Sequence, residues 1–316
     1  MIIVENNGLI QRQLHELECM ENCDSEELLA ELTRNQRKIN TSAELYYNEK
    51  LDNFWIEHYY CDISPNSATS TQLLKELQCL VKKTHRYKHP YYISKDQYLY
   101  TWVDLQPNGQ LKSIYSGIQK NPQKVIEEEF ATIQRRSEHY RKLMINQMDT
   151  SKNFKRQVQK ISNQHKFNAE HVVPQSWFKA REPMKGDLHN LFTCEPKCNS
   201  IRSNFPYYEF ESKKDSRRTR NHCGLYEMGR FEPEHGKGTA ARATLYFLLR
   251  YPRKIIKRYR KRINIPLLFR WHGQYPVTNY EKHRNQAIFE IQGNRNPFID
   301  IPDLTKKIGF LEQMKQ

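Results

Sequence analysis

A carboxylate and an imidazole stand next to each other in the middle of the chain, at Glu170 and His171. Further along come the amide of Asn199 and the guanidinium of Arg202. A neutral histidine can take a proton from water near neutral pH. Oxygen ligands suit Mg²⁺, and an arginine can offset the charge that builds up on a phosphate. These residue types predict metal-assisted hydrolysis of a phosphodiester.

Each of these residues also has a simpler interpretation. Neighbours on a regular strand face opposite ways, so Glu170 and His171 share a pocket only if the strand ends or bends near Pro174. Asn199 is also suited to capping a helix, and Arg202 to a surface ion pair. The spacing alone does not show that these four side chains meet.

Asp187 and His189 lie between these two groups, two residues apart. They fit a supporting place behind the reacting residues. They equally fit a structural pair in which Asp187 fixes the imidazole of His189.

Cysteines near Asn199 raise a separate question. Cys194, Cys198 and Cys223, with His222, have residue types that hold structural Zn²⁺, although a fourth ligand is uncertain. The alternatives are reduced thiols, or one disulfide if the protein is exported.

The charge of the chain is unevenly placed. The net charge is +15, but residues 1–68 hold 13 acidic and 5 basic residues, so the rest of the chain is strongly basic. Such a body favours a polyanionic partner, most simply nucleic acid. One stretch is densely basic, and we expect it to contact phosphates with its tyrosines stacking on bases. Its predicted nucleic-acid-binding residues are Arg253, Lys254, Lys257, Arg258, Arg260 and Lys261.

Composition excludes several classes of protein. The 316 residues have a mean hydropathy of -0.90, with 12% aromatic residues that can build a core. No apolar run approaches the roughly 20 residues of a membrane helix, and the amino end lacks the features of a signal peptide. We expect a monomeric cytoplasmic protein without a membrane partner, with export by a non-standard route as the alternative.

Local patterns predict mostly helices. We expect a helical pair within residues 9–59, and helices over 71–84, after Asn121-Pro122, over 239–250 and from Thr278 to Gly293. Residues 98–105 and 111–115 read as strands joined by Pro107-Asn108-Gly109. The prediction is an α+β protein with a helical extension (1–68) before the main domain (69–316).

Several motifs together resemble the endonuclease I family, which are bacterial non-specific nucleases of the ββα-metal, or His-Me finger, class. The motifs run from Glu170 to Phe178, from Asp187 to Leu191 and from Asn199 to Asn204. The similarity continues through residues 238–252, 284–289 and 292–300, and includes the upstream segment ending Ile114-Tyr115-Ser116-Gly117. It covers roughly residues 70–303.

The resemblance implies roles for individual residues. Glu170 and Asn199 would hold Mg²⁺, or another divalent cation such as Mn²⁺, and His171 would be the general base on a strand of an embedded ββα-metal finger. Lys185 stands where some relatives carry a glutamate near the metal, which leaves the third ligand open, with water as a candidate. The transition-state arginine is either Arg181 or Arg202.

The function that follows is a largely sequence-non-specific endonuclease. It would hydrolyse DNA, RNA or both to 5′-phosphate and 3′-hydroxyl ends. The alternative is a catalytically silent nucleic-acid-binding protein on a nuclease scaffold. Residues 1–68 fall outside the resemblance, and their acidity suggests that they mask the basic face or dock an inhibitor. An ordinary packing extension is the competing interpretation.

Overall fold

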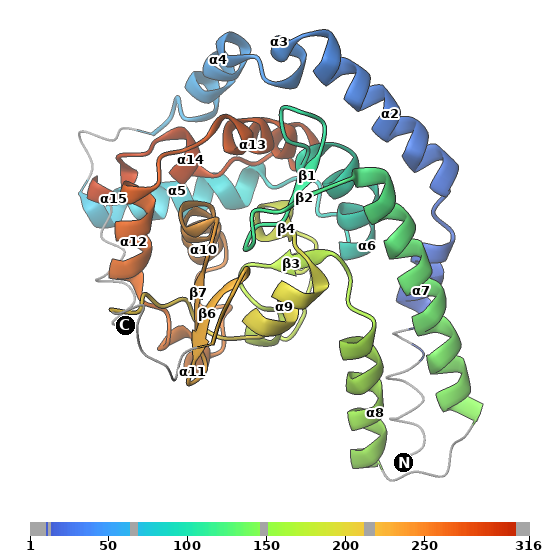
Figure 1. Cartoon of the computed structure of the whole chain (residues 1–316). Coiled ribbons are helices and arrows are strands. Elements are labelled where there is room, and N and C mark those ends of the chain that lie inside the picture. Colours follow the sequence, from blue (N-terminus) through green and yellow to red (C-terminus); the bar gives the residue numbers. More distant parts are fainter. Residues whose placement is uncertain (1–10, 12–13, 64–68, 146–150, 212–218, 308–316) are drawn as a thin grey trace.

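Helices dominate the protein, and its strands are short (Figure 1). The computed structural model describes residue 11 and residues 14–63, 69–145, 151–211 and 219–307. The strands form two two-stranded sheets and one three-stranded sheet. This architecture is compatible with the predicted α+β class. Among the described residues, no helix has the length and apolar character needed to cross a bilayer.

The secondary structure runs as follows. A short amino-terminal helix covers residues 14–21. The α-helices are α2 (Ser25–Thr41), α3 (Ala43–Tyr46), α4 (Glu49–Tyr59), α5 (Ser70–Thr84), α6 (Tyr91–Ile93), α7 (Pro122–Ile145), α8 (Ser151–Gln164), α9 (Pro196–Arg202), α10 (Lys237–Arg250), α11 (Lys257–Arg260), α12 (Ile265–Gln274), α13 (Asn279–Gln292), α14 (Pro297–Asp300) and α15 (Leu304–Lys307). A π-helix, η1 (Ser94–Val103), and two 3₁₀ turns, η2 (Gln175–Trp177) and η3 (Leu188–Asn190), complete the helical segments. The strands are β1 (Leu111–Lys112), β2 (Gln119–Lys120), β3 (Ala169–His171), β4 (Leu191–Thr193), β5 (Thr219–Asn221), β6 (Gly224–Glu227) and β7 (Arg230–Pro233).

The predicted helices with clear end signals are confirmed. Helix α5 is present but begins at Ser70, so its N-cap is Thr69, whose side chain accepts a hydrogen bond from Gln72 N, rather than the expected Ser70 or Thr71. Thr278 and Glu281 form the predicted capping box of α13, and Gly293 ends that helix with a φ of 87°. Helix α10 also lies where the apolar pattern placed it.

The predicted strand over residues 98–105 is wrong, because most of this segment belongs to η1. Its tyrosines, tryptophan and valine favour strands in general. Here Leu99, Tyr100 and Val103 are fully buried together in one core, at a spacing that suits a helix. Leu111 instead begins β1, which pairs with β2 in antiparallel register.

The sheet made of β3 and β4 lies between two hydrophobic cores. One core gathers around α5, α10 and α12, and the other around η1, α7 and the amino-terminal helices. Phe192 on β4 packs into the first core, while Ala169 on β3 and Leu191 on β4 pack into the second. Strand β4 is therefore packed against both cores, and β3 is packed against the second core through Ala169.

The amino-terminal helices pack against the main body and arch over it (Figure 1). Asn35 Nδ2 donates to Thr101 O at 3.1 Å, and Tyr46 Oη donates to Leu105 O at 2.9 Å. The Asp52 carboxylate lies 2.8 Å from the Arg295 guanidinium. The predicted domain boundary near residue 68 stays a prediction, since residues 64–68 lie outside the described part.

Candidate active site

The side chains expected to react come from β3 and α9. Strand β3 runs antiparallel to β4, with Glu170 opposite Phe192 and His171 opposite Leu191. Helix α9 follows β4 and lies against β3, because Asn199 Nδ2 donates to Ala169 O at 2.8 Å. This hydrogen bond anchors the Asn199 side chain beside the expected reacting residues.

Glu170, His171 and Asn199 all line one cavity of about 650 Å³. Strand β3 ends at His171. Two neighbouring residues such as Glu170 and His171 can face one pocket only where a regular strand ends or bends, and this condition is met here. The structure thus brings together the carboxylate, the imidazole and the amide that the sequence singled out.

His171 is held in one tautomer. Its Nε2 lies 2.8 Å from Lys185 O, and a carbonyl oxygen only accepts, so Nε2 carries the proton. Its Nδ1 lies 3.1 Å from Gln175 Nε2, which donates to it. Burial lowers the pKa of His171 to about 3. The ring is therefore neutral at ordinary pH, with an unprotonated lone pair on Nδ1.

Glu170 is buried and oriented by two neighbours. Tyr115 Oη donates to Glu170 Oε1 at 2.8 Å, and Arg202 Nε lies 3.3 Å from the same oxygen. Burial raises the pKa of Glu170, while the Arg202 charge and the Tyr115 hydrogen bond act in the opposite direction. These contacts fix the position of the carboxylate.

The donor set fits a hard divalent cation. The Nδ2 of Asn199 is committed to Ala169 O, and in the described part of the chain no hydrogen bond engages its Oδ1. A carboxylate and an amide oxygen, completed by water and phosphate oxygens, are what Mg²⁺ accepts. Glu170 and Asn199 are thus the residues that would hold the ion.

Arg202 lies behind Glu170. It is 1% exposed, donates to Val172 O and does not line the cavity. Arg181, the other candidate for the transition-state arginine, does not line it either. The cationic side chains that do line it are Arg136, Lys166, Lys179 and Lys185. The geometry favours Arg202 as a positioning residue for Glu170.

Asp187 and His189 also lie outside the cavity lining. Tyr246 Oη and Tyr251 Oη each donate to Asp187 Oδ2 at 2.8 Å. The ring of His189 reaches Asn294 O at 3.2 Å. Both residues tie the segment that follows Lys185 to α10 and to the carboxyl-terminal region, and they do not touch His171.

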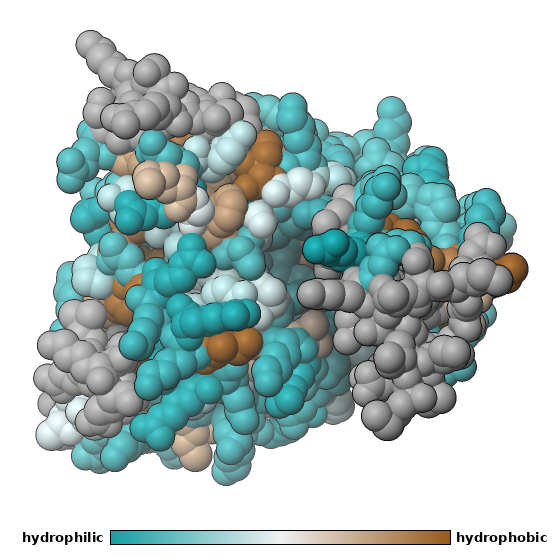
Figure 2. Space-filling view, turned by 90° about the horizontal axis from the view of Figure 1, so that it is seen from below, coloured by the Kyte–Doolittle hydropathy of each residue, from teal (hydrophilic) through white to brown (hydrophobic). Residues whose placement is uncertain are grey.

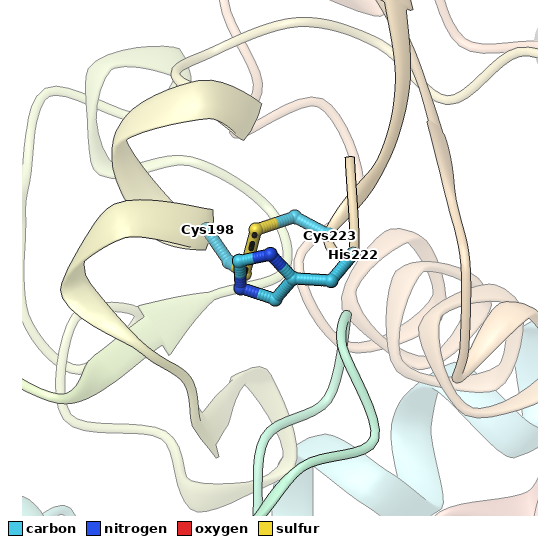
Figure 3. Close-up of side chains that lie close together, drawn as sticks. All are labelled: Cys198, His222 and Cys223. Atoms are coloured by element: carbon cyan, nitrogen blue, oxygen red, sulfur yellow. Dashed lines mark hydrogen bonds between the residues drawn. A yellow bond between two sulfur atoms is a disulfide. The ribbon is translucent and has the colours of Figure 1, made fainter. Parts of the chain in front are cut away.

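The cysteines are arranged differently from a zinc site. Cys198 and Cys223 form a disulfide, and His222 lies beside it (Figure 3). Cys194 is a buried free thiol outside the group formed by these three residues. Zinc is held by thiolates, which a disulfide does not offer. The prediction of zinc on Cys194, Cys198 and Cys223 is therefore contradicted by this bond, which braces α9 next to Asn199.

The basic stretch around α11 lies outside the cavity lining. Ile256 N donates to Trp177 O at 2.8 Å, which places the stretch beside the segment after β3. The Tyr259 ring stacks on Trp177, and the Arg258 guanidinium covers Tyr259. This tyrosine is therefore already stacked within the protein, and base stacking by it stays a prediction.

Sequence reasoning missed four residues of the site. Tyr115 and Gln175 lie within motifs that the sequence analysis singled out, so their place in those motifs could have identified them as site residues. Lys166 lies three residues before β3 without any motif of its own. Glu16 lines the cavity from the amino-terminal helix and pairs with Lys185. No local pattern predicts a contact across so many residues.

Curated relatives include three nucleases that match part of this chain. An extracellular deoxyribonuclease of Aeromonas hydrophila is 33% identical over 119 residues, 37% of this chain and 50% of the relative. A periplasmic deoxyribonuclease of the same organism is 33% identical over 119 residues, 37% of this chain and 48% of the relative. An extracellular ribonuclease of Bacillus amyloliquefaciens is 30% identical over 158 residues, 45% of this chain and 53% of the relative. The chain spans about half the length of these relatives.

Their names contradict the expectation of a cytoplasmic protein. Relatives named extracellular or periplasmic point to secretion, so that expectation is wrong. The Cys198–Cys223 disulfide fits this correction, because disulfides persist in oxidising compartments.

The family comparison covers most of the chain. The model of the family described as Endonuclease I matches residues 69–303, which include every residue of the cavity except those on the amino-terminal helix. This chain belongs to the endonuclease I family.

Proposed function

We propose that the protein is a metal-dependent endonuclease that hydrolyses phosphodiester bonds of DNA, RNA or both, with little sequence selectivity. The observation that carries the proposal is the shared cavity, in which a neutral His171 with an unprotonated Nδ1 lies beside Glu170 and Asn199. The β3–β4 sheet followed by α9 supports the interpretation of this unit as a ββα-metal finger. The proposed form is a monomer.

His171 accepts a proton from water in the proposed reaction. The water oxygen then bonds to phosphorus, the bond from phosphorus to the 3′ oxygen breaks, and the departing 3′ oxygen takes a proton from solvent water. The products carry a 5′-phosphate and a 3′-hydroxyl. Lys185 O holds the imidazole in the required tautomer, and Gln175 holds Nδ1 until water replaces it. Mg²⁺, or Mn²⁺, on Glu170 and Asn199 supplies stabilisation of negative charge on the phosphate.

The test compares the wild type, His171→Ala and the control His58→Ala on duplex DNA, single-stranded DNA and RNA, with and without EDTA. His58 is an exposed residue of α4 outside the cavity. We expect His171→Ala to lower the rate by about 10²–10⁴-fold, the range of general-base catalysis, and His58→Ala to leave it unchanged. EDTA should abolish cleavage. Salt-sensitive binding by the wild type without cleavage in any divalent metal would support the silent nucleic-acid-binding protein instead.

We also propose that the amino-terminal region restrains this site from within the chain. Leu17 and Met20 are buried and line the cavity. The Glu16 carboxylate forms an ion pair with Lys185, a cation that would otherwise be available to a phosphate. This contact supports masking by the chain itself over docking of an inhibitor. Glu16→Gln should raise kcat/KM several-fold at low salt, while Glu18→Gln, on an exposed position of the same helix, should not. Unchanged or lower activity of Glu16→Gln would contradict masking.

A further inference from the structure

A second pocket lies next to the catalytic cavity. It has a volume of about 390 Å³ and is bordered by α7, the end of α8 and α9. Lys166 lines both this pocket and the catalytic cavity. Figure 2, seen from the side on which α8 projects, shows a hollow between the main body and the projecting helices, with mostly hydrophilic walls. The two spaces are therefore neighbouring parts of one surface.

Helix α9 presents a different face to each space. Asn199 on the helix and Ser203 at its C-cap line the catalytic cavity. Pro196 and Ser200, four residues apart on the helix, line the second pocket together with Lys197. Pro196 and Ser200 share a face because the helical repeat places residues four apart on one side. A strand whose phosphate lies at Asn199 can thus reach Lys197 by crossing one helix.

The adjacent residues Arg135 and Arg136 of helix α7 also face different spaces. Arg136 lines the catalytic cavity and is held by the protein, since it donates to His165 O and to Ser162 O and lies over the Phe167 ring. Arg135 lines the second pocket and is exposed. Only Arg135 of the two is therefore available to a ligand.

The second pocket carries uncompensated positive charge. Within the described residues, Arg135, Lys166 and Lys197 form no ion pair or side-chain hydrogen bond. Glu128 is the acidic residue in its lining, and its carboxylate already accepts from Asn168 Nδ2 and Lys120 Nζ. Free cations around a polar pocket suit the phosphates of a nucleic-acid backbone.

We propose that the nucleic-acid strand continues from the catalytic cavity past Lys166 into this second pocket, where Arg135 and Lys197 bind the phosphates flanking the bond that is cut. This inference rests on the proposed nuclease function and adds the path of the substrate. The path differs from the stretch around α11, which lines neither space. It holds the backbone only, so it adds no sequence selectivity.

The test uses the full chain carrying Arg135→Glu and Lys197→Glu, and two substrates. A 20-nucleotide single strand reaches the second pocket, whereas a dinucleotide, with one phosphodiester, fills the catalytic cavity alone. We expect the double variant to raise KM for the long strand by roughly tenfold and to leave dinucleotide cleavage unchanged. The dependence of log affinity on log salt should become shallower by about 1.4, at about 0.7 for each lost phosphate contact of a single strand.

Two matched double variants serve as controls. Lys75→Glu with Lys82→Glu makes the same charge change on exposed residues of α5, outside both pockets, and should leave KM within twofold of the wild type. Lys257→Glu with Lys261→Glu makes the same charge change on the basic stretch around α11, which is the alternative binding path for the nucleic acid. The inference is overturned if the α11 variant loses the long strand while the Arg135 and Lys197 variant keeps it, or if the latter loses both substrates equally. A wild type that cleaves neither substrate would overturn the nuclease function itself.

Discussion

The arginines buried near the carboxyl end differ from the cations around the active site in whether they have acidic partners. Arg242 makes a two-bond contact with Glu281, at 2.8 and 2.9 Å. Arg295 reaches both Asp52 and Asp300 at 2.8 Å. These arginines belong to the motifs that carry the family resemblance, yet their charges are fully used inside the protein.

The cations around the cavity and the second pocket are mostly free. Arg135, Lys166, Lys179 and Lys197 have no ion pair within the part of the chain that the structure describes. Lys185 is an exception, because it forms an ion pair with Glu16. A buried charge depends on its partner, because losing the partner leaves an uncompensated charge in the interior, whereas an unpaired charge beside a cavity attracts an anion. Pairing thus separates structural from substrate-binding charge better than sequence motifs do.

Removing a paired arginine should have the largest effect on stability. Arg295→Leu leaves Asp52 and Asp300 buried without their cation, so the free energy of unfolding should fall by about 3–5 kcal/mol. Urea unfolding followed by circular dichroism measures this loss. Lys306→Ala, which breaks the fully exposed pair with Asp303, is the control and should leave the free energy of unfolding almost unchanged. Similar losses in both variants would break the comparison.

The side of the molecule near α9 is held by a covalent link as well. The Cys198–Cys223 disulfide closes a loop with a sequence separation of 25 residues, and the loop-entropy account gives it about 3 kcal/mol. The double variant Cys198→Ser with Cys223→Ser should lose stability by that order in thermal unfolding. Cys61→Ser, at an exposed free cysteine, should change little. A double variant as stable as the wild type would show that the brace is dispensable.

Buried histidines sharpen the contrast, because they stay neutral where the arginines stay charged. Burial lowers the pKa of His85 to about 4, of His171 to about 3 and of His283 to about 4, against about 6.5 in an unfolded chain. The unfolded chain therefore binds protons first as the pH falls. Stability from these groups is complete above about pH 6.5 and falls below it, by up to about 1.4 kcal/mol per pH unit for each histidine.

Urea unfolding at pH 7, 6 and 5 measures this slope. His171→Ala removes one of the three groups, so its slope should be shallower by one proton. An identical slope in the variant and the wild type would mean that His171 is already protonated in the fold.

Removing a free cation should have the smallest effect on stability and a visible effect on substrate. Lys179 is exposed at the cavity, so Lys179→Gln should change the free energy of unfolding by less than about 0.5 kcal/mol. KM for a polynucleotide should rise by a few-fold, since one phosphate contact is lost. A large loss of stability without a change in KM would place Lys179 with the structural charges.

Local signals in the sequence were enough for the helices with strong ends. Thr278, Glu281 and Gly293 specify α13 through hydrogen bonds that form within a few residues, so the sequence predicts them. The error over residues 98–105 arises from tertiary packing, because Leu99, Tyr100 and Val103 are buried together in one core at helical spacing although their residue types favour strands.

The candidate site was predictable only where the residues proposed to react lie in short motifs. Glu170, His171 and Asn199 were found in this way, and the cavity joins them. Glu16 and Lys166 were not, because their places depend on how distant helices pack. Arg202 was singled out for its residue type, and its burial behind Glu170 favours a role in positioning that carboxylate over the predicted contact with the transition state, which stays a prediction.

The contact between Asp52 and Arg295 has a practical consequence for anyone who wants a shorter enzyme. Deleting the first 68 residues would remove Asp52, one of the two carboxylates that pair with the fully buried guanidinium of Arg295. Lost activity in such a trimmed protein would then report damage to the fold and say nothing about a restraining segment. A minimal version has to exchange Arg295 for an apolar residue, together with Asp300, at the same time as the helices are removed.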